Sequence, residues 1–179
     1  MPVEIIAEIA NAHQGDPRMA AALAERAFAA GADAVKFQIY YADELLVERH
    51  PRFAHFSDQA FDAETWAEVI PAAAEKGPVY CDVFGPRALA TALAHGTAGV
   101  KVHSSDTSNM TLLNRVADTG CRVFLSAGGT TVRELQRAID VFARVDSRPV
   151  LLHGFQSYPT QVEDSNLARL AWLSETFDN

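Results

Sequence analysis

Two stretches of this chain decide the fold: Ala34-Val35-Lys36-Phe37-Gln38 and Gly99-Val100-Lys101-Val102-His103-Ser104. Each is a short apolar segment of the kind that forms a buried β-strand, and each carries a lysine where the strand ends. In (β/α) barrels the catalytic groups come from the C-terminal ends of several strands. Two lysines in equivalent positions on two strands can therefore converge on one doubly charged ligand. The pattern predicts an anion-binding site.

Six strand-like segments alternate along the chain with Ala- and Leu-rich segments of helical period. Strict alternation predicts an α/β fold in which parallel strands are joined by crossover helices. The predicted strands are Val3–Ile9, Ala34–Ile39, Val79–Val83, Gly99–Val102, Arg122–Ser126 and Val150–His153. The predicted helices are Pro17–Ala30, Ala63–Lys76, Pro86–Ala94, Met110–Thr119, Val132–Ala143 and Leu167–Phe177.

Several helix boundaries carry recognisable residues. Asp16 before Pro17 is typical of an N-cap followed by a proline in the first helical position. Glycines at 31, 77, 96 and 120 stand where left-handed C-caps are expected. Residues 40–62 show no periodicity and predict an extended loop over the active face of a barrel.

Six β/α units are fewer than the eight of a closed barrel. The sequence is compatible with an open sheet of six parallel strands, or with the front part of a longer chain. It stops at Asn179, directly after the sixth predicted helix and where a seventh strand would begin. We therefore expect a TIM-type (β/α) barrel, with about six of its eight units present in residues 1–179.

The composition restricts the class of protein. With 179 residues, 49% of them hydrophobic, the chain can bury one core of ordinary size. A net charge of -8 without any run of Lys or Arg argues against a nucleic-acid or acidic-membrane partner. The start of the chain lacks the pattern of a signal peptide, and no segment is long and apolar enough for a membrane span. Cys81 and Cys121 lack metal-ligand spacing, which fits reduced thiols in a cytoplasmic protein.

Polar residues at the ends of the first two predicted strands are candidates for a functional site. Glu8 ends an apolar strand and needs a cation or a donor to offset desolvation. It could serve chemistry or form a structural salt bridge with Lys36, and both can hold together. Gln38 points to the same side as Lys36, which suits an anion or a polyol. His13 could be a base, a ligand or an orienting hydrogen-bonder.

The later strand ends carry further candidates. Lys101 is followed by Ser104 and Asp106, and this combination suits phosphate binding with proton transfer nearby, although a solvated loop is the alternative. Ser126 and the Gly-Gly turn after it could cradle an anion or form a simple loop. The polar segment from His153 through Gln156 to Tyr158 could hydrogen-bond a sugar-like substrate.

Five blocks in this order resemble the N-acetylneuraminate (sialic acid) synthase family, over Ala7 to Phe177. The blocks are A-E-I-x-N-x-H-x-G-D from Ala7, G-A-D-A-V-K-F-Q from Gly31, K-V-x-S-x-D from Lys101, L-S-x-G from Leu125, and L-L-H-x-x-x-x-Y-P from Leu151, followed by Asn166-Leu167. The resemblance implies condensation of phosphoenolpyruvate with an N-acetylated hexose such as N-acetylmannosamine. The products would be a nonulosonic (nine-carbon, sialic-type) acid and phosphate.

The resemblance also implies roles for individual residues. Lys36 and Lys101 would be the cations around phosphoenolpyruvate, with Ser104 and Ser126 as donors to its phosphate or carboxylate. Glu8 and Asp106 would be the acidic residues of the active site, and Asp106 would handle the proton of the attacking water. The contacts to the acceptor sugar would come from Gln38, Gln156 and Tyr158.

The chain also departs from the family pattern. Where the family has Ser-Thr-Pro-Phe after the third strand, this chain has Cys81-Asp82-Val83-Phe84, and the carboxylate of Asp82 is expected to repel phosphate. Gln156 replaces a usual Asn or Ser, and Ala127-Gly128-Gly129 replaces Thr-Gly-Met. The shape of the pocket, and with it the acceptor sugar, is expected to differ.

In the family, a divalent metal (Mn²⁺ or Mg²⁺) is bound by histidines on strands seven and eight, and neither segment occurs in residues 1–179. No metal ligand is assigned in this chain, and the metal is expected for the complete protein. The C-terminal antifreeze-like domain, which covers the partner's site in a homodimer, is also expected outside these residues, so they should not turn over alone. The alternatives are a non-catalytic or truncated homologue that keeps a sugar- or anion-binding pocket, and a related aldolase or 3-deoxy sugar-acid synthase.

Overall fold

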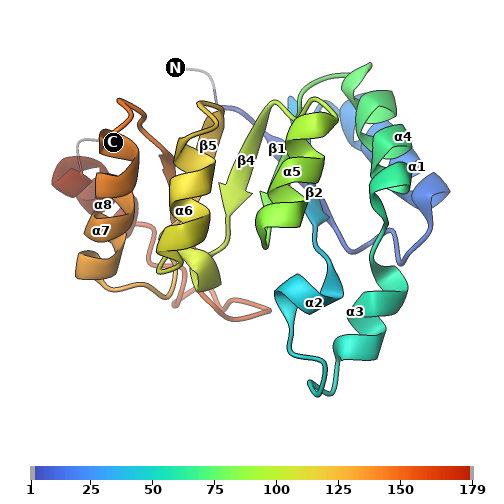
Figure 1. The fold of residues 1–179 in the computed structure, drawn as a ribbon. Helices are drawn as coiled ribbons and strands as arrows, with labels where there is room; N and C mark the ends of the chain where they lie inside the picture. The colour runs from blue at the N-terminus through green and yellow to red at the C-terminus, as the bar shows by residue number, and fades with distance from the viewer. Residues whose placement is uncertain (1–2, 178–179) are drawn as a thin grey trace. The chain divides into compact units, whose positions relative to one another are not determined.

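Strands alternate with helices throughout the computed structural model, which describes residues 3–177 (Figure 1). The predicted alternation of strands and helices is therefore confirmed. The elements are β1 (Ile6–Ala10), α1 (Pro17–Ala29), β2 (Ala34–Ile39), α2 (Ala42–Leu45), α3 (Phe53–Gln59), α4 (Ala63–Ala74), β3 (Val79–Val83), α5 (Pro86–Ala94), β4 (Gly99–Val102), the 3₁₀ helix η1 (Ser104–Asp106), α6 (Met110–Ala117), β5 (Arg122–Ser126), α7 (Val132–Ala143), β6 (Val150–Leu152) and α8 (Arg169–Phe177).

The predicted boundaries hold for strands β2 to β5 and fail at the two ends of the chain. Strand β1 runs from Ile6 to Ala10 rather than from Val3 to Ile9, and just before it the N–H of Ile5 donates to the Asp33 carboxylate at 2.7 Å. Strand β6 ends at Leu152, one residue early. The connection 40–62, predicted to lack regular structure, contains α2 and α3; helices of one or two turns are too short to show a period.

The predicted helix caps are confirmed except at one glycine. The Asp16 side chain accepts a hydrogen bond from the N–H of Arg18 at 2.8 Å, as an N-cap should. The glycines at 31, 96 and 120 have positive φ angles of 97°, 82° and 66°. Gly77 does not adopt this conformation. A Cβ at Gly77 would lie 2.6 Å from the ring of Phe28, so that glycine serves close packing instead.

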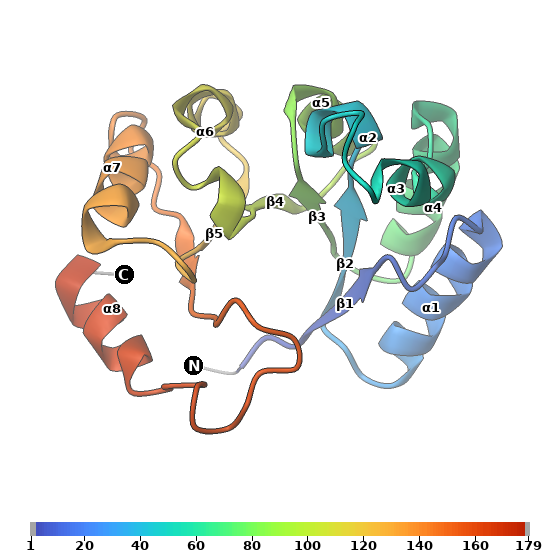
Figure 2. The same cartoon turned by 90° about the horizontal axis from the view of Figure 1, so that it is seen from below.

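The chain divides into two compact units, Met1–Val100 and Lys101–Asn179. In the first unit β2 lies between β1 and β3, and both pairings are parallel. The helices α1, α4 and α5 lie on one side of these strands (Figure 2). The core fills the space between strands and helices, and its largest members include Phe37, Ile39, Trp66 and Ile70.

In the second unit β5 pairs with β6 in parallel, with Ser126 opposite Leu152. Helices α6 and α7 pack against each other, and the core includes Leu113, Leu125 and Phe142. Helix α7 begins with a capping box in which Thr131 and Glu134 satisfy each other's backbone N–H groups.

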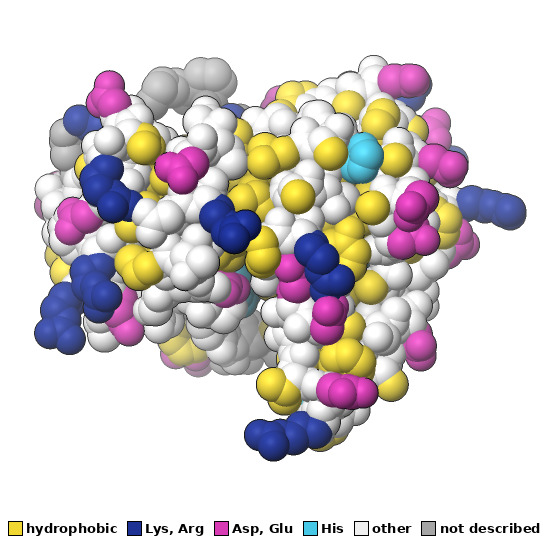
Figure 3. Space-filling model, in the orientation of Figure 1, with side chains coloured by type: hydrophobic (Ala, Val, Ile, Leu, Met, Phe, Trp, Pro, Cys, Tyr) yellow, Lys and Arg dark blue, Asp and Glu magenta, His cyan; other side chains and the backbone are white. Residues whose placement is uncertain are grey.

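The surface shown in Figure 3 mixes basic with acidic side chains rather than gathering either sign into one patch. In the part of the chain that the structure describes, no helix is long and apolar enough to cross a membrane.

Candidate functional site

A buried lysine lies between two carboxylates in the first unit. The Nζ atom of Lys36 on β2 forms ion pairs with Glu8 on β1 and with Asp82 on β3, the latter at 2.9 Å. The register places Glu8 opposite Lys36 and Asp82 opposite Gln38, so the three charged side chains meet across neighbouring strands. The side chains of Lys36 and Asp82 are 9% and 1% exposed, while that of Glu8 is 44% exposed. We call these three residues the Lys36 cluster.

The two carboxylates of the Lys36 cluster stabilise the charged form of the lysine. Burial alone would lower the pKa of Lys36, but the carboxylates of Asp82 and Glu8 outweigh this effect and hold the pKa above its ordinary value of 10.5. The lysine is therefore charged at neutral pH. The salt bridge to Glu8 that the sequence suggested is present. Asp82, expected to repel phosphate, is turned toward Lys36 and almost fully buried, so its charge is already paired with a cation.

His13 is a structural residue of the loop after β1. It is 1% exposed, and its ring packs 4.3 Å from the ring of Phe61. Its Nδ1 atom accepts the N–H of Gly15 at 3.1 Å, and burial lowers the pKa of His13. Among the alternatives that the sequence left open, the geometry favours the orienting hydrogen-bonder. Cys81 is equally buried, and burial raises the pKa of its thiol to about 12.

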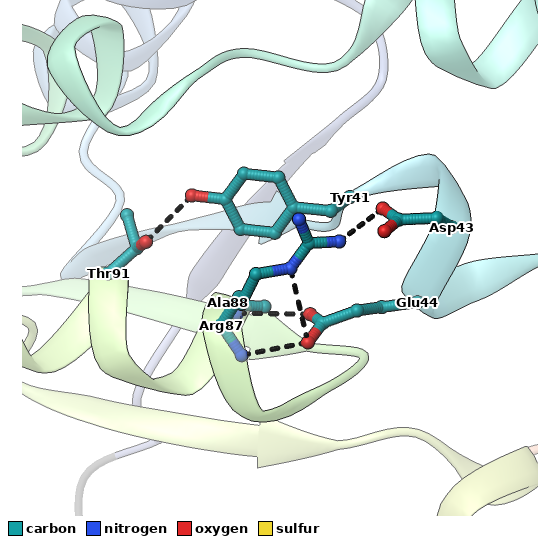
Figure 4. A network of polar contacts seen from close by, with 6 residues as sticks. All are labelled: Tyr41, Asp43, Glu44, Arg87, Ala88 and Thr91. Atoms are coloured by element: carbon teal, nitrogen blue, oxygen red, sulfur yellow. Dashed lines mark hydrogen bonds and ion pairs between the residues drawn. The ribbon is translucent and has the colours of Figure 1, made fainter.

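The connection after β2 is fastened to the start of α5 (Figure 4). Glu44 accepts hydrogen bonds from the N–H groups of Arg87, at 2.9 Å, and Ala88, at 3.3 Å, and so caps a helix whose own N-cap residue, Gly85, has no side chain. Arg87 also pairs with Asp43 and lies over the ring of Tyr41 at 4.5 Å. The sequence did not indicate this network, because its members are 40 to 50 residues apart.

In the second unit, Lys101, Ser104 and Asp106 lie within six residues, at the end of β4 and in η1. The carboxylate of Asp106 accepts hydrogen bonds from the Ser105 hydroxyl and from the Asn109 amide, both at 3.2 Å. Asp106, Ser105 and Asn109 are called the Asp106 cluster below. The carboxylate is oriented by residues of its own segment and is partly exposed, as an accessible proton acceptor must be.

Sequence reasoning missed Thr107, which is fully buried next to the Asp106 cluster. Its hydroxyl donates to the main-chain carbonyl of Ser126 at 3.1 Å and joins η1 to the end of β5. No sequence signal separates Thr107 from the polar residues around it, since the bond spans 19 positions.

The glycine turn after Ser126 allows two chain segments to approach closely. A Cβ atom on Gly128 would lie 2.7 Å from the carbonyl oxygen of Gly154 and 3.2 Å from the side-chain nitrogen of Gln156. Gly129 has a positive φ of 70°, which favours glycine. The turn therefore allows the segments that follow β5 and β6 to pack closely.

A pocket of about 540 Å³ opens beside this turn in the second unit. Gln156 lines it, whereas Tyr158 is fully exposed and does not. Arg169 and the acidic residues Glu163 and Asp164, which the sequence did not single out, contribute the charged groups of its wall. The remaining lining residues are Gly129, Thr130, His153, Gly154, Phe155 and Asn166.

Within residues 3–177, no three His, Cys, Asp or Glu side chains are grouped so that they could hold a metal ion.

The model of the NeuB family matches residues 23–179. This chain belongs to the NeuB family. The resemblance noted in the sequence is thereby confirmed, since relatives and solved structures of this family carry the names of sialic-type acid synthases.

Two relatives and one solved structure illustrate which proteins this chain is similar to. It is 30% identical, over 99% of its length and 53% of the relative's, to the uncharacterized protein MJ1065 of Methanocaldococcus jannaschii. It is 26% identical to the N,N'-diacetyllegionaminic acid synthase of Legionella pneumophila, over 97% and 54% of the two chains. The crystal structure of an N-acetylneuraminic acid (sialic acid) synthetase from Leptospira borgpetersenii, in complex with citrate, has a TM-score of 0.93 and 30% identity, covering 98% of this chain and 62% of that one.

The chain thus has the α/β, TIM-like fold of the NeuB family, as predicted. It spans about half the length of the curated relatives it matches. The number of units in the complete barrel stays a prediction.

Proposed function

We propose that this chain forms the N-terminal part of the catalytic barrel, about six of eight β/α units, of a phosphoenolpyruvate-dependent nonulosonic acid synthase. The acceptor would be an N-acetylated hexose similar to N-acetylmannosamine. The observation that carries the proposal is a lysine kept charged while buried among parallel strands, within a chain of the NeuB family. The names of the legionaminic and sialic acid synthases support the class of reaction.

The residues of each unit suit part of this chemistry. Phosphoenolpyruvate is a trianion, and the family resemblance assigns to Lys36 and Lys101 the role of the cations that such a ligand requires. Ser104 and Ser126 supply hydroxyl donors for its phosphate or carboxylate. Amide groups suit a polyol, and Gln156 offers one in the wall of the 540 Å³ pocket, while Gln38 offers one beside the Lys36 cluster.

The reaction forms one C–C bond to the sugar and one C–O bond to water, and it breaks the C–O bond to phosphate. The methylene carbon of phosphoenolpyruvate attacks the aldehyde carbon of the sugar, and the aldehyde oxygen takes up a proton. Water adds to the enol carbon and gives a proton to a base, the role we assign to Asp106. The C–O bond to phosphate then breaks, leaving a 2-keto acid and inorganic phosphate. Glu8 would keep Lys36 oriented and charged.

The complete protein would work as a homodimer in the cytoplasm and use Mn²⁺ or Mg²⁺ held by ligands outside residues 3–177. The test uses the full-length protein with phosphoenolpyruvate, either metal and a panel of N-acetylated hexoses. We expect phosphate release with at least one sugar, and a product whose mass equals that of the sugar plus the pyruvate unit. Lys36→Ala and Lys101→Ala should abolish phosphate release, and Lys76→Ala, at an exposed lysine, should not.

A second candidate is a homologue that binds a sugar or an anion without turnover. The pairing of Lys36 with two carboxylates favours it, because this lysine then has less charge to offer a ligand. Calorimetric binding of an N-acetylated hexose without consumption of phosphoenolpyruvate would support this candidate. Activity that survives both lysine substitutions, or turnover only with sugars that lack an N-acetyl group, would contradict the synthase proposal.

A further inference from the structure

One hydrogen bond, from the side chain of His153, joins the two ends of the segment 154–165 that follows β6. The Nε2 atom of His153 lies 2.7 Å from the main-chain carbonyl oxygen of Ser165, 12 residues further along the chain. A carbonyl oxygen only accepts, so Nε2 carries the hydrogen of this bond. The Nδ1 atom is buried and has no hydrogen-bond partner among the residues that the structure describes. The bond to Ser165 is therefore the hydrogen bond through which the ring acts on this segment.

The first residues of the segment are placed by the glycine turn. A Cβ on Gly128 would lie 2.7 Å from the Gly154 carbonyl, and a Cβ on Gly129 would lie 3.0 Å from the Cγ atom of Gln156. These close approaches define where the main chain and the stem of Gln156 lie. They act only at the beginning of the segment.

The rest of the segment has little to hold it. Tyr158 is 102% and Val162 is 87% exposed, so burial of apolar groups does not anchor the middle. Among the described residues, its other side-chain hydrogen bonds are local, from Thr160 to the Ser157 carbonyl and from Ser165 to the Val162 carbonyl. Local bonds bend the chain without tying it to the rest of the unit. The bond from His153 does tie it, at the end that leads to the acidic wall of the 540 Å³ pocket.

We propose that His153 is a positioning residue that holds the end of the segment 154–165 and so fixes the wall around Glu163 and Asp164 for the acceptor sugar. The link to a sugar rests on the proposed function, whereas the closing of the segment does not. His153 acts on this segment through the Ser165 carbonyl.

Two substitutions of His153 test whether the Nε2 donor, rather than another property of the imidazole ring, holds the segment. Gln places a side-chain nitrogen near the position of Nε2, whereas Asn is shorter and reaches only the position of Nδ1. In the full-length protein, we expect His153→Asn to raise KM for the N-acetylated hexose about tenfold, since a lost hydrogen bond to a partly buried carbonyl has this order of effect. The KM for phosphoenolpyruvate should change much less. His153→Gln should restore both values.

Hydrogen exchange in the same variants gives a readout that needs no activity. Amides of 154–165 should exchange faster in His153→Asn and as slowly as wild type in His153→Gln. Equal exchange and equal KM in wild type and His153→Asn would overturn the proposal, as would a His153→Gln variant as impaired as His153→Asn. If His153→Asn fails to fold, His153→Gln decides: slow exchange supports the proposal and fast exchange overturns it. A wild type that consumes no phosphoenolpyruvate would reject the proposed function, while the exchange contrast still decides the role of His153.

Discussion

The Lys36 cluster of the first unit and the Asp106 cluster of the second hold their charges in different ways. Lys36 meets carboxylates 28 and 46 positions away along the chain, and all three reach one another only because β2 lies between β1 and β3. Asp106 is held by side chains one and three positions away. The first arrangement depends on strand register and burial, and the second on the geometry of a short turn before α6.

Because the charges of the two clusters differ in burial, the two clusters should tolerate different substitutions. A buried charge that loses its partner retains the cost of its desolvation. A partly exposed carboxylate in a local turn can exchange a lost partner for water. The Lys36 cluster should therefore couple chemistry to the stability of the whole unit, whereas the Asp106 cluster should leave stability almost unaffected when it is changed.

Lys36→Met gives the sharpest test of this contrast. Methionine fills the volume but leaves Asp82 buried without this ion pair, so we expect a loss of about 3 to 5 kcal/mol in the free energy of unfolding. Asp106→Asn keeps an acceptor oxygen and should cost less than about 0.5 kcal/mol. Denaturant unfolding of both variants measures the difference.

The double variant Lys36→Met/Asp82→Leu is the control, because it removes both buried charges and leaves only Glu8, whose side chain is 44% exposed and can be solvated by water. It should recover most of the loss. Lys76→Met, at an exposed lysine, should leave the unfolding midpoint unchanged. A Lys36→Met protein as stable as the Asp106→Asn protein would contradict the distinction between the two clusters.

Gly128→Ala tests whether the second unit also depends on contacts between distant segments. The added methyl group would clash with the Gly154 carbonyl, which is backbone and cannot rotate away, so we expect a loss of about 1 to 3 kcal/mol. Gly154→Ala is a matched control, since nothing lies within 4 Å of a Cβ at that position and its φ is not positive. Thermal unfolding of the pair should show a lower midpoint for Gly128→Ala alone; equal midpoints would show that the segment can move aside.

The Glu44 cap offers a smaller version of the same comparison (Figure 4). Glu44→Ala removes the acceptor from two N–H groups at the start of α5 and should cost about 1 kcal/mol, the usual effect of losing a helix cap. Asp43→Ala removes only an exposed partner of Arg87 and should have no measurable effect on unfolding. Gly85→Ala should match Glu44→Ala, because its methyl group would lie 2.5 Å from the Glu44 carboxyl group and displace it. Unchanged stability in both variants would show that water replaces the cap.

Features set by local contacts could be predicted from the sequence, whereas most of those set by contacts between distant segments could not. The period of each segment and the caps at Asp16 and Gly31 are local signals, and they predicted the strands and most helix boundaries. The pairing of Glu8 with Lys36 could be suggested, because neighbouring strands in a β/α chain are usually adjacent. The position of Asp82 on the far side of Lys36 required the register between β2 and β3, which no local pattern contains. The Glu44 cap and the His153 bond likewise join segments whose approach only the folded chain defines.

Alkaline pH gives a further test of burial in the first unit. Burial raises the pKa of Cys81 from 9.0 and that of Tyr40 from 10.0, each to about 12, and the paired carboxylates raise the pKa of Lys36 above 10.5. In each case the folded protein keeps a proton that the unfolded chain releases, so the stabilising contribution is complete below the unfolded pKa and is lost as pH rises toward the folded one. The free energy of unfolding should therefore begin to fall near pH 9. Cys81→Ala should move this onset to about pH 10, where the unfolded Tyr40 begins to ionise. Tyr40→Phe should leave the onset near pH 9 and flatten the decline above it, and an onset unchanged in Cys81→Ala would show that this thiol is accessible to solvent in the native state.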